Sequence, residues 1–298
     1  MPDQHSIAAW FQGLQDSICQ ALEQADGSAT FREDTWERPG GGGGRSRVIA
    51  NGAVLEKGGV GFSAVHGEIH PQMRASLGVG EGTSFFATGV SIVQHPVSPK
   101  VPIIHMNVRY FELSNGTCWF GGGIDLTPHY VVDEDARWFH QQLKEVCDRF
   151  SPDYYPRFKN WADDYFFSPH RNETRGIGGI FYDHQKPSDE AAAEHLWAFT
   201  QAVGSSFAPI YTELIARHKD EPYTEQERDW QLLRRGRYVE FNLVHDRGTK
   251  FGLETNGRTE SILMSLPPLA RWEYDHHPAE GSPEALTLSK LHKGIAWI

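Results

Sequence analysis

The sequence lacks the features that mark several large classes of protein. It has 3 cysteines in 298 residues and no C-x-x-C pair, which argues against zinc-ribbon, iron–sulfur and dithiol redox sites. No run of about 18 apolar residues occurs, and the N-terminus has neither the basic flank nor the apolar core of a secretory signal. An odd number of cysteines fits reduced thiols. We therefore expect a cytoplasmic protein without a membrane span.

Positive charge is also scarce. The chain has 28 Lys and Arg against 39 Asp and Glu, a formal net charge of −11, which argues against nucleic-acid binding. H-E-x-x-H is absent, and neither G-x-x-x-x-G-K-[ST] nor G-x-G-x-x-G opens a helix, so zinc-protease and nucleotide motifs are not indicated. Arg nevertheless outnumbers Lys 19 to 9, and Arg is the better bidentate ligand for carboxylates.

The hydrophobic pattern predicts an α+β fold. Helical spacing predicts an amphipathic helix over residues 3–25, and alternating runs predict strands from about 46 to 126. Further helices are predicted near 133–150, 154–168, 188–203, 205–218 and 224–235, with a short strand at 178–184. Asp133 is expected to cap the first of these helices, and Thr224 with Glu227 forms a capping box at the start of the last. Two closing runs, RYVEFNLVHD and RTESILMSL, are predicted as strands. We expect one domain over residues 1–298, a single large antiparallel β-sheet flanked on both faces by α-helices.

The strand predicted in VPIIHMNVRYFEL carries the most informative side chains. Alternation places the apolar residues from Ile104 to Tyr110 on one face and His105, Asn107 and Arg109 on the other. On the same face, the positions beyond His105 and Arg109 at the two ends of the strand are apolar, Phe111 among them. A solvent-facing strand rarely has that pattern, so we expect this face to line a walled pocket.

Two glycine-rich segments leave alternatives open. Asp125 follows three glycines in WFGGGIDLTPHY, which let another backbone or a flat ligand approach closely. Asp125 either caps a turn or accepts hydrogen bonds from an N–H-rich substrate, and the spacing does not decide. The run Gly40–Gly44 predicts a flexible loop, with a substrate lid as the alternative.

The histidines and arginines are widely spaced. His95, His105, His140 and His170 form no compact ligand motif, and a histidine on an apolar stripe is more often a hydrogen-bonded core residue than a metal ligand. Several arginines recur near the predicted pocket rims and suit a substrate with several carboxylates, although some of them form only surface ion pairs. They are Arg171, Arg175, Arg234, Arg235, Arg237, Arg247 and Arg258.

Seven segments can be taken together. In chain order, over roughly residues 30–275, they are GVGFSAVHG, ATGVSIVQHP, VPIIHMNVRYFE, WFGGGIDLTPHY, YFFSPHRNETRGIGGIFYD, RRGRYVEFNLVHDRGTKFGL and RTESILMSLPP. As a set they resemble the oxygen-dependent coproporphyrinogen III oxidase family. The chain departs from the family pattern at Gly61, Ser98, Cys118, His184 and Asn256.

The resemblance implies an enzyme of haem biosynthesis that uses molecular oxygen to convert two propionates of coproporphyrinogen III to vinyl groups, releasing carbon dioxide and hydrogen peroxide. It also implies a homodimer and no organic cofactor. His105 matches the proposed proton donor, Asp125 the aspartate thought to meet the pyrrole N–H groups, and Arg109 joins them in the expected catalytic set. The positions that match substrate binding are Ser91, Asn107, Val108, Arg109, Asn256, Gly257 and Arg258. The positions that match a divalent metal site, with Mn²⁺ as the candidate, are His95, His105, His140 and His170.

The chemistry of this substrate agrees with the composition. Four propionates account for arginines in an acidic protein, and the electron-rich porphyrinogen can react with oxygen without a flavin or haem. The protein then supplies binding, orientation and proton transfer. The alternatives are a tetrapyrrole carrier without turnover and a histidine-dependent metallohydrolase.

Overall fold

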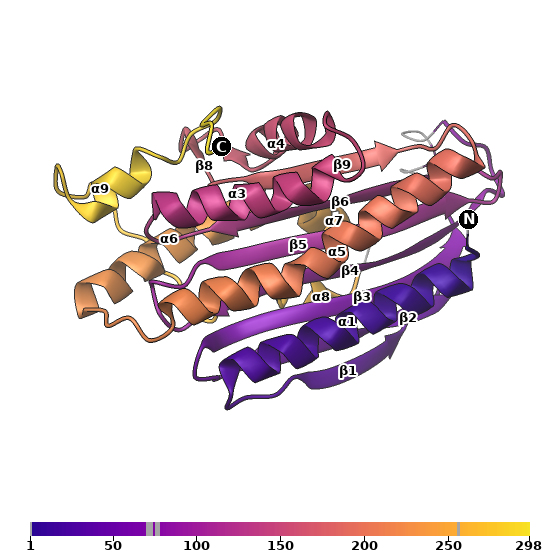
Figure 1. The fold of residues 1–298 in the computed structure, drawn as a ribbon. Helices are drawn as coiled ribbons and strands as arrows, with labels where there is room; N and C mark the ends of the chain where they lie inside the picture. The colour runs from indigo at the N-terminus through magenta and orange to yellow at the C-terminus, as the bar shows by residue number, and fades with distance from the viewer. Residues whose placement is uncertain (1, 70–73, 75–77, 255–256) are drawn as a thin grey trace.

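A computed structural model describes residues 2–69, 74, 78–254 and 257–298. Its described part contains a seven-stranded antiparallel sheet with strand order β1-β2-β3-β4-β5-β6-β9 (Figure 1). The strands are β1 (Arg32–Glu37), β2 (Gly42–Ala50), β3 (Leu55–Glu68), β4 (Ser84–Pro96), β5 (Ile103–Leu113), β6 (Cys118–Thr127) and β9 (Gly179–Gln185). A second, two-stranded sheet pairs β7 (Phe167–Ser168) with β8 (Glu173–Thr174).

Helices cover both faces of the large sheet (Figure 1). On one face lie α1 (Gln4–Asp26), α3 (Asp133–Asp148), α4 (Tyr154–Tyr165) and α5 (Glu190–His218). On the other lie α6 (Glu225–Val244), α7 (Arg247–Glu254) and α8 (Thr259–Leu263), while α9 (Pro283–Leu288) lies near one end of the sheet. The predicted α+β architecture is confirmed. The prediction of a single domain stays a prediction.

The main core lies between the sheet and the first of these helix layers. On β5, Ile104, Met106 and Val108 are fully buried, as their alternation predicts, and they belong to one cluster with residues of α1 and α5. Burial of each such side chain stabilises the fold by about 1.5–3 kcal/mol. The opposite face of β5 is therefore free to carry polar side chains.

The predicted strand in RYVEFNLVHD is wrong. The capping box of Thr224 and Glu227 begins α6 as expected, but the helix continues to Val244 instead of ending near Arg235. The buried side chains of its C-terminal half recur at helical spacing: Arg234, Arg235, Tyr238, Phe241 and Asn242. Tertiary burial of this stripe outweighs the local preference of the aromatic and β-branched residues for strands.

Three smaller predictions are also corrected. The segment RTESILMSL contains the short helix α8 rather than a strand. Residues 190–218 form the single helix α5, with Pro209 inside it, rather than two helices. Asp133 does not cap α3: it is the first helical residue, and its carboxylate accepts a 2.6 Å hydrogen bond from Lys290.

The predicted glycine loop is largely a strand. Gly42 to Gly44 begin β2 and pair with β3, and the connection from β1 is a short turn. The ring of Trp36 packs on Gly44, where an added Cβ would lie 2.5 Å from a ring carbon. Glycine is needed at this position for close packing. Among the described helices, none is both long and apolar enough to cross a membrane.

Candidate active site

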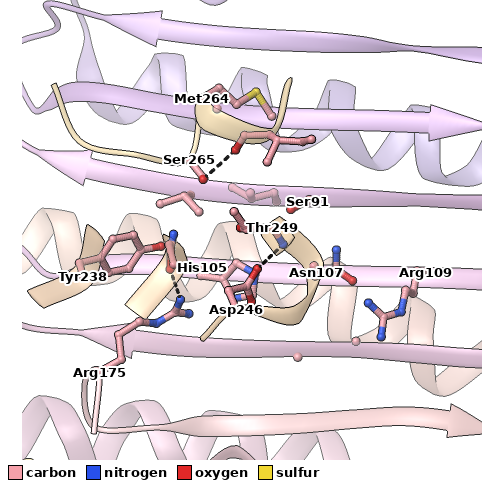
Figure 2. Close-up of a pocket in the computed structure, with 18 of the residues that line it drawn as sticks. Ser91, His105, Asn107, Arg109, Arg175, Tyr238, Asp246, Thr249, Met264 and Ser265 are labelled. Carbon is pink, nitrogen blue, oxygen red and sulfur yellow. Dashed lines mark hydrogen bonds between the residues drawn. The ribbon is translucent and has the colours of Figure 1, made fainter. Parts of the chain in front are cut away.

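The polar face of β5 lines a cavity of about 270 Å³, called the first cavity below (Figure 2). His105, Asn107 and Arg109 all contribute to its wall, and Ser91 joins them from β4, where it pairs with Asn107 in the strand register. Residues of α6, α7 and α8 close the opposite side. The pocket predicted from the alternation of β5 is confirmed.

His105 is held from behind by a buried carboxylate. Its Nδ1 lies 2.7 Å from Oδ1 of Asp125, the residue that it faces on β6. Asp125 is 1% exposed, and it also accepts hydrogen bonds of 2.7 and 2.8 Å from Nη2 of Arg175. Burial opposes ionisation of Asp125, but the charge of Arg175 and the hydrogen bond from His105 outweigh it and lower the pKa. The ionised carboxylate fixes the proton on Nδ1, which leaves Nε2 to exchange a proton with a ligand.

The Arg175 side chain is buried among aromatic rings. Its guanidinium carbon lies 4.4 Å from the ring centre of Phe166 and 4.9 Å from that of Tyr238. Its Nη1 donates a 2.8 Å hydrogen bond to Oδ1 of Asn242. Cation–π contacts and the ion pair with Asp125 together offset the cost of burying this charge.

The structure therefore changes the role expected of Asp125. Asp125 neither caps a turn nor lines the first cavity: its carboxylate points to His105 and Arg175. A substrate in the first cavity meets His105, and Asp125 acts through it. The predicted direct contact between Asp125 and pyrrole N–H groups does not fit this geometry.

Asp246 is the carboxylate that lines the first cavity, and the sequence reasoning missed it. Figure 2 shows its side chain beside Thr249, whose backbone N–H donates a 2.7 Å hydrogen bond to Oδ2. Oδ1 accepts a 3.0 Å hydrogen bond from the hydroxyl of Tyr165. Each oxygen keeps a lone pair for a ligand donor. An aspartate just before a helix is a capping signal, but the hydrophobic pattern of this segment predicts a strand, which hides that signal.

A second cavity of about 740 Å³ adjoins the first. The two share Ser91, Ser261, Ile262 and Met264 as lining residues. Several aromatic side chains line the second cavity, including Phe85 and Phe111, whose rings stack 5.6 Å apart. Gly257 and Arg258 line it as well, and Arg258 is paired with Asp34. Asn256 lies outside the described residues.

A family model described as coproporphyrinogen III oxidase matches residues 6–297. The chain belongs to the coproporphyrinogen III oxidase family. Membership gives it a role in porphyrin and haem biosynthesis as an oxidoreductase that acts on coproporphyrinogen.

The four histidines that match the family's metal positions do not form one site. His95 is buried and donates from Nε2 to the carbonyl of Ser265, and burial lowers its pKa to about 3. His140 uses both ring nitrogens, one with the Tyr155 hydroxyl and one with the carbonyl of Ile177, each at 2.9 Å.

His170, the fourth of these histidines, contacts a different set of side chains. Its Nδ1 lies 2.9 Å from His245, and its Nε2 lies 3.1 Å from Glu240. Within the described residues, no three His, Cys, Asp or Glu side chains are placed to hold a metal ion. These histidines therefore do not fit a shared divalent metal, and no step below is assigned to one.

One substrate-binding position implied by the family resemblance, Val108, directs its side chain away from the first cavity, and its role in binding stays a prediction. Val108 is fully buried in the core on the sheet face opposite the first cavity. Its side chain cannot touch a ligand there. Ser91, Asn107 and Arg109 do line the first cavity, and their roles in binding stay predictions.

Proposed function

We propose that this member of the coproporphyrinogen III oxidase family uses molecular oxygen to convert two propionates of coproporphyrinogen III to vinyl groups, giving protoporphyrinogen IX. Each turnover breaks one C–H bond at the propionate carbon next to the ring and the bond to the carboxylate carbon. The electrons of the second bond form the vinyl double bond, and carbon dioxide leaves. Oxygen accepts the two electrons of the C–H bond and two protons and leaves as hydrogen peroxide.

The observation that carries this proposal is the set of complementary groups around the first cavity. His105 supplies an anchored proton-transfer group, Arg109 a carboxylate ligand, and Asp246 an acceptor for N–H donors. A porphyrinogen presents a transferable proton, propionate carboxylates and pyrrole N–H groups close together. The three side chains match these three features.

The two cavities suggest how the macrocycle binds. At about 270 Å³ the first cavity is smaller than the roughly 300–1,000 Å³ typical of ligand sites. It suits one pyrrole ring with its propionate, whereas the aromatic second cavity suits the rest of the macrocycle. Arg109 then binds the reacting propionate, and Asp246 accepts a hydrogen bond from the pyrrole N–H of that ring. Nε2 of His105 exchanges a proton with the substrate.

The alternatives are less well supported. A carrier has no use for a proton-transfer histidine anchored by a buried ion pair, and the histidines do not fit a metallohydrolase site. The test is incubation of the purified protein with coproporphyrinogen III under air and under argon. We expect carbon dioxide, hydrogen peroxide and divinyl product under air only. Tight binding without carbon dioxide under air would indicate a carrier, and oxygen-independent turnover would refute the proposed chemistry.

A further inference from the structure

Arg109 does not enter the first cavity unsupported. Its Nη2 lies 2.8 Å from Oδ1 of Asp183, which comes from β9. The Arg109 side chain is 40% exposed and that of Asp183 only 19%, so the carboxylate is the more fixed partner. Since β6 lies between β5 and β9 in the sheet, the ion pair spans the full width of β6.

The pair crosses β6 at Gly121, the residue that faces Arg109 in the register. A Cβ added at Gly121 would lie 2.7 Å from Oδ1 of Asp183 and 2.9 Å from Nε of Arg109. Both distances are too short for ordinary contact. The next glycine differs, because a Cβ at Gly122 would meet the Tyr182 hydroxyl at 2.8 Å. Because Gly121 has no side chain, the ion pair packs directly against its backbone.

Asp183 is itself held by a second interaction, a hydrogen bond made to the same oxygen that contacts Arg109. The backbone N–H of His184 donates a 2.8 Å hydrogen bond to Oδ1, and the His184 ring stacks on Trp119 with centres 5.1 Å apart. Burial disfavours the Asp183 anion, yet the charge of Arg109 outweighs this effect and lowers the pKa of Asp183. The carboxylate is thus a charged and stationary anchor.

We propose that Asp183 is a positioning residue that fixes the guanidinium of Arg109, with Gly121 leaving the space for it, so that Arg109 holds one propionate of the substrate in a single place. This inference rests on the proposed function. A guanidinium has five N–H donors in a rigid plane, so one part can bind Asp183 while another part binds a carboxylate. Without the anchor, the long side chain samples several rotamers, and the propionate is held in several places.

This role predicts a particular kinetic signature. Asp183→Asn keeps the shape of the side chain but weakens its hold on Arg109. The positive charge of Arg109 remains and still attracts propionates, so KM should stay within about threefold of wild type or fall. Because a displacement of about 1 Å can cost roughly 100-fold in rate, kcat should fall about 10- to 100-fold.

A double-mutant cycle separates positioning from a general structural role. In an Arg109→Ala background, Asp183→Asn should change kcat by less than about twofold, because the residue through which it acts is gone. Gly121→Ala should lower kcat like Asp183→Asn and should also have little effect in that background. It serves as the second variant if Asp183→Asn folds poorly. The matched controls are Asp164→Asn, which breaks an exposed ion pair with Lys293, and Gly13→Ala, which meets nothing within 4 Å; both should keep wild-type kcat.

The outcomes are distinguishable. Two results would refute the inference while the proposed function stands, provided that the wild-type protein turns over coproporphyrinogen III. One is that Asp183→Asn keeps more than a third of the wild-type kcat. The other is that the loss of kcat caused by Asp183→Asn adds in full to the loss caused by Arg109→Ala. If the wild-type protein releases no carbon dioxide from coproporphyrinogen III under air, both are wrong. A kcat loss that disappears in the Arg109→Ala background supports the inference.

Discussion

His105 and Asp125 face each other across β5 and β6, with Nδ1 of the imidazole 2.7 Å from Oδ1 of the carboxylate. The carboxylate is closed off from the first cavity, and its remaining hydrogen bonds come from Arg175. The charge of Asp125 therefore acts on a substrate only through His105, whose ring it orients and whose proton it holds on Nδ1. Histidine–carboxylate pairs of this kind fix the tautomer in many catalytic sites.

The first prediction concerns this pair. Asp125→Asn should lower kcat about 100- to 10,000-fold, because the single amide oxygen cannot accept from both Arg175 and His105, and an amide N–H that faces Nδ1 favours the wrong tautomer. It should also destabilise the fold by about 3–5 kcal/mol, because Arg175 is left as a buried charge without its anion. Steady-state kinetics and urea unfolding measure the two effects. Unchanged stability with normal turnover would contradict the buried ion pair itself.

Asp246 gives the contrasting prediction. Asp246→Asn keeps an acceptor for the N–H of Thr249, so the fold should lose less than about 1 kcal/mol. It removes the charge that faces the first cavity, so turnover should fall about 100- to 10,000-fold. Asp164→Asn, which changes an exposed carboxylate, serves as the control. If Asp246→Asn retains a tenth or more of wild-type turnover, another group accepts the hydrogen bond from the pyrrole N–H.

The second cavity can be tested by filling it. Ala87 lies on its wall, and Ala87→Phe adds bulk there while leaving the first cavity unaltered. We expect the affinity for coproporphyrin III, a stable oxidised analogue measured by fluorescence, to fall at least 10-fold. Thr35→Phe adds the same ring type on the exposed strand β1 and should bind normally. Equal binding by both variants would mean that the macrocycle lies elsewhere.

Because the four histidines lie far apart, we predict that turnover does not require a bound metal ion. Protein that has been exhaustively treated with a chelator should keep most of its turnover, because the described residues offer no three-ligand site. The measurement is aerobic carbon dioxide release before and after chelation, with metal content determined in parallel. Loss of activity that Mn²⁺ alone restores would show that a metal is required.

The parts of the site that were predictable depend on local periodicity. His105, Asn107 and Arg109 share a face of β5 because side chains alternate along any strand, and that rule needs no knowledge of the rest of the chain. Asp246 was missed for a related reason. Its position at a helix start depends on where α6 ends, and the end of α6 is set by tertiary burial rather than by local propensity.

The direction of Asp125 could not be predicted from its own segment. Its partner Arg175 is 50 residues away in the chain and comes just before β9, which pairs with β6. The pairing of Arg109 with Asp183 likewise needs the register of three strands. Such contacts follow from the strand order, which a single sequence does not determine.

The last prediction concerns Asp26, which joins the end of α1 to the turn between β2 and β3. Its Oδ2 accepts hydrogen bonds of 2.9 and 2.8 Å from the backbone N–H groups of Val54 and Leu55, and Oδ1 accepts one from Ala29 at 2.9 Å. Burial raises the pKa of Asp26, but these hydrogen bonds to the charged form outweigh it and bring the pKa down to about 2.

The sign of the pH effect follows from this shift. The pKa of the folded state lies below the ordinary value of 3.8, so Asp26 stabilises the fold above about pH 4, and this contribution is lost as the pH falls toward 2. Asp26→Asn removes the charge and should lower the free energy of unfolding at pH 7 by about 1–3 kcal/mol. The difference from wild type should shrink below pH 4, because protonation neutralises Asp26 in the wild type as well. Urea unfolding at pH 7 and at pH 3 measures both; a difference that is constant with pH would mean that the charge of Asp26 contributes nothing and that only the shape of its side chain matters.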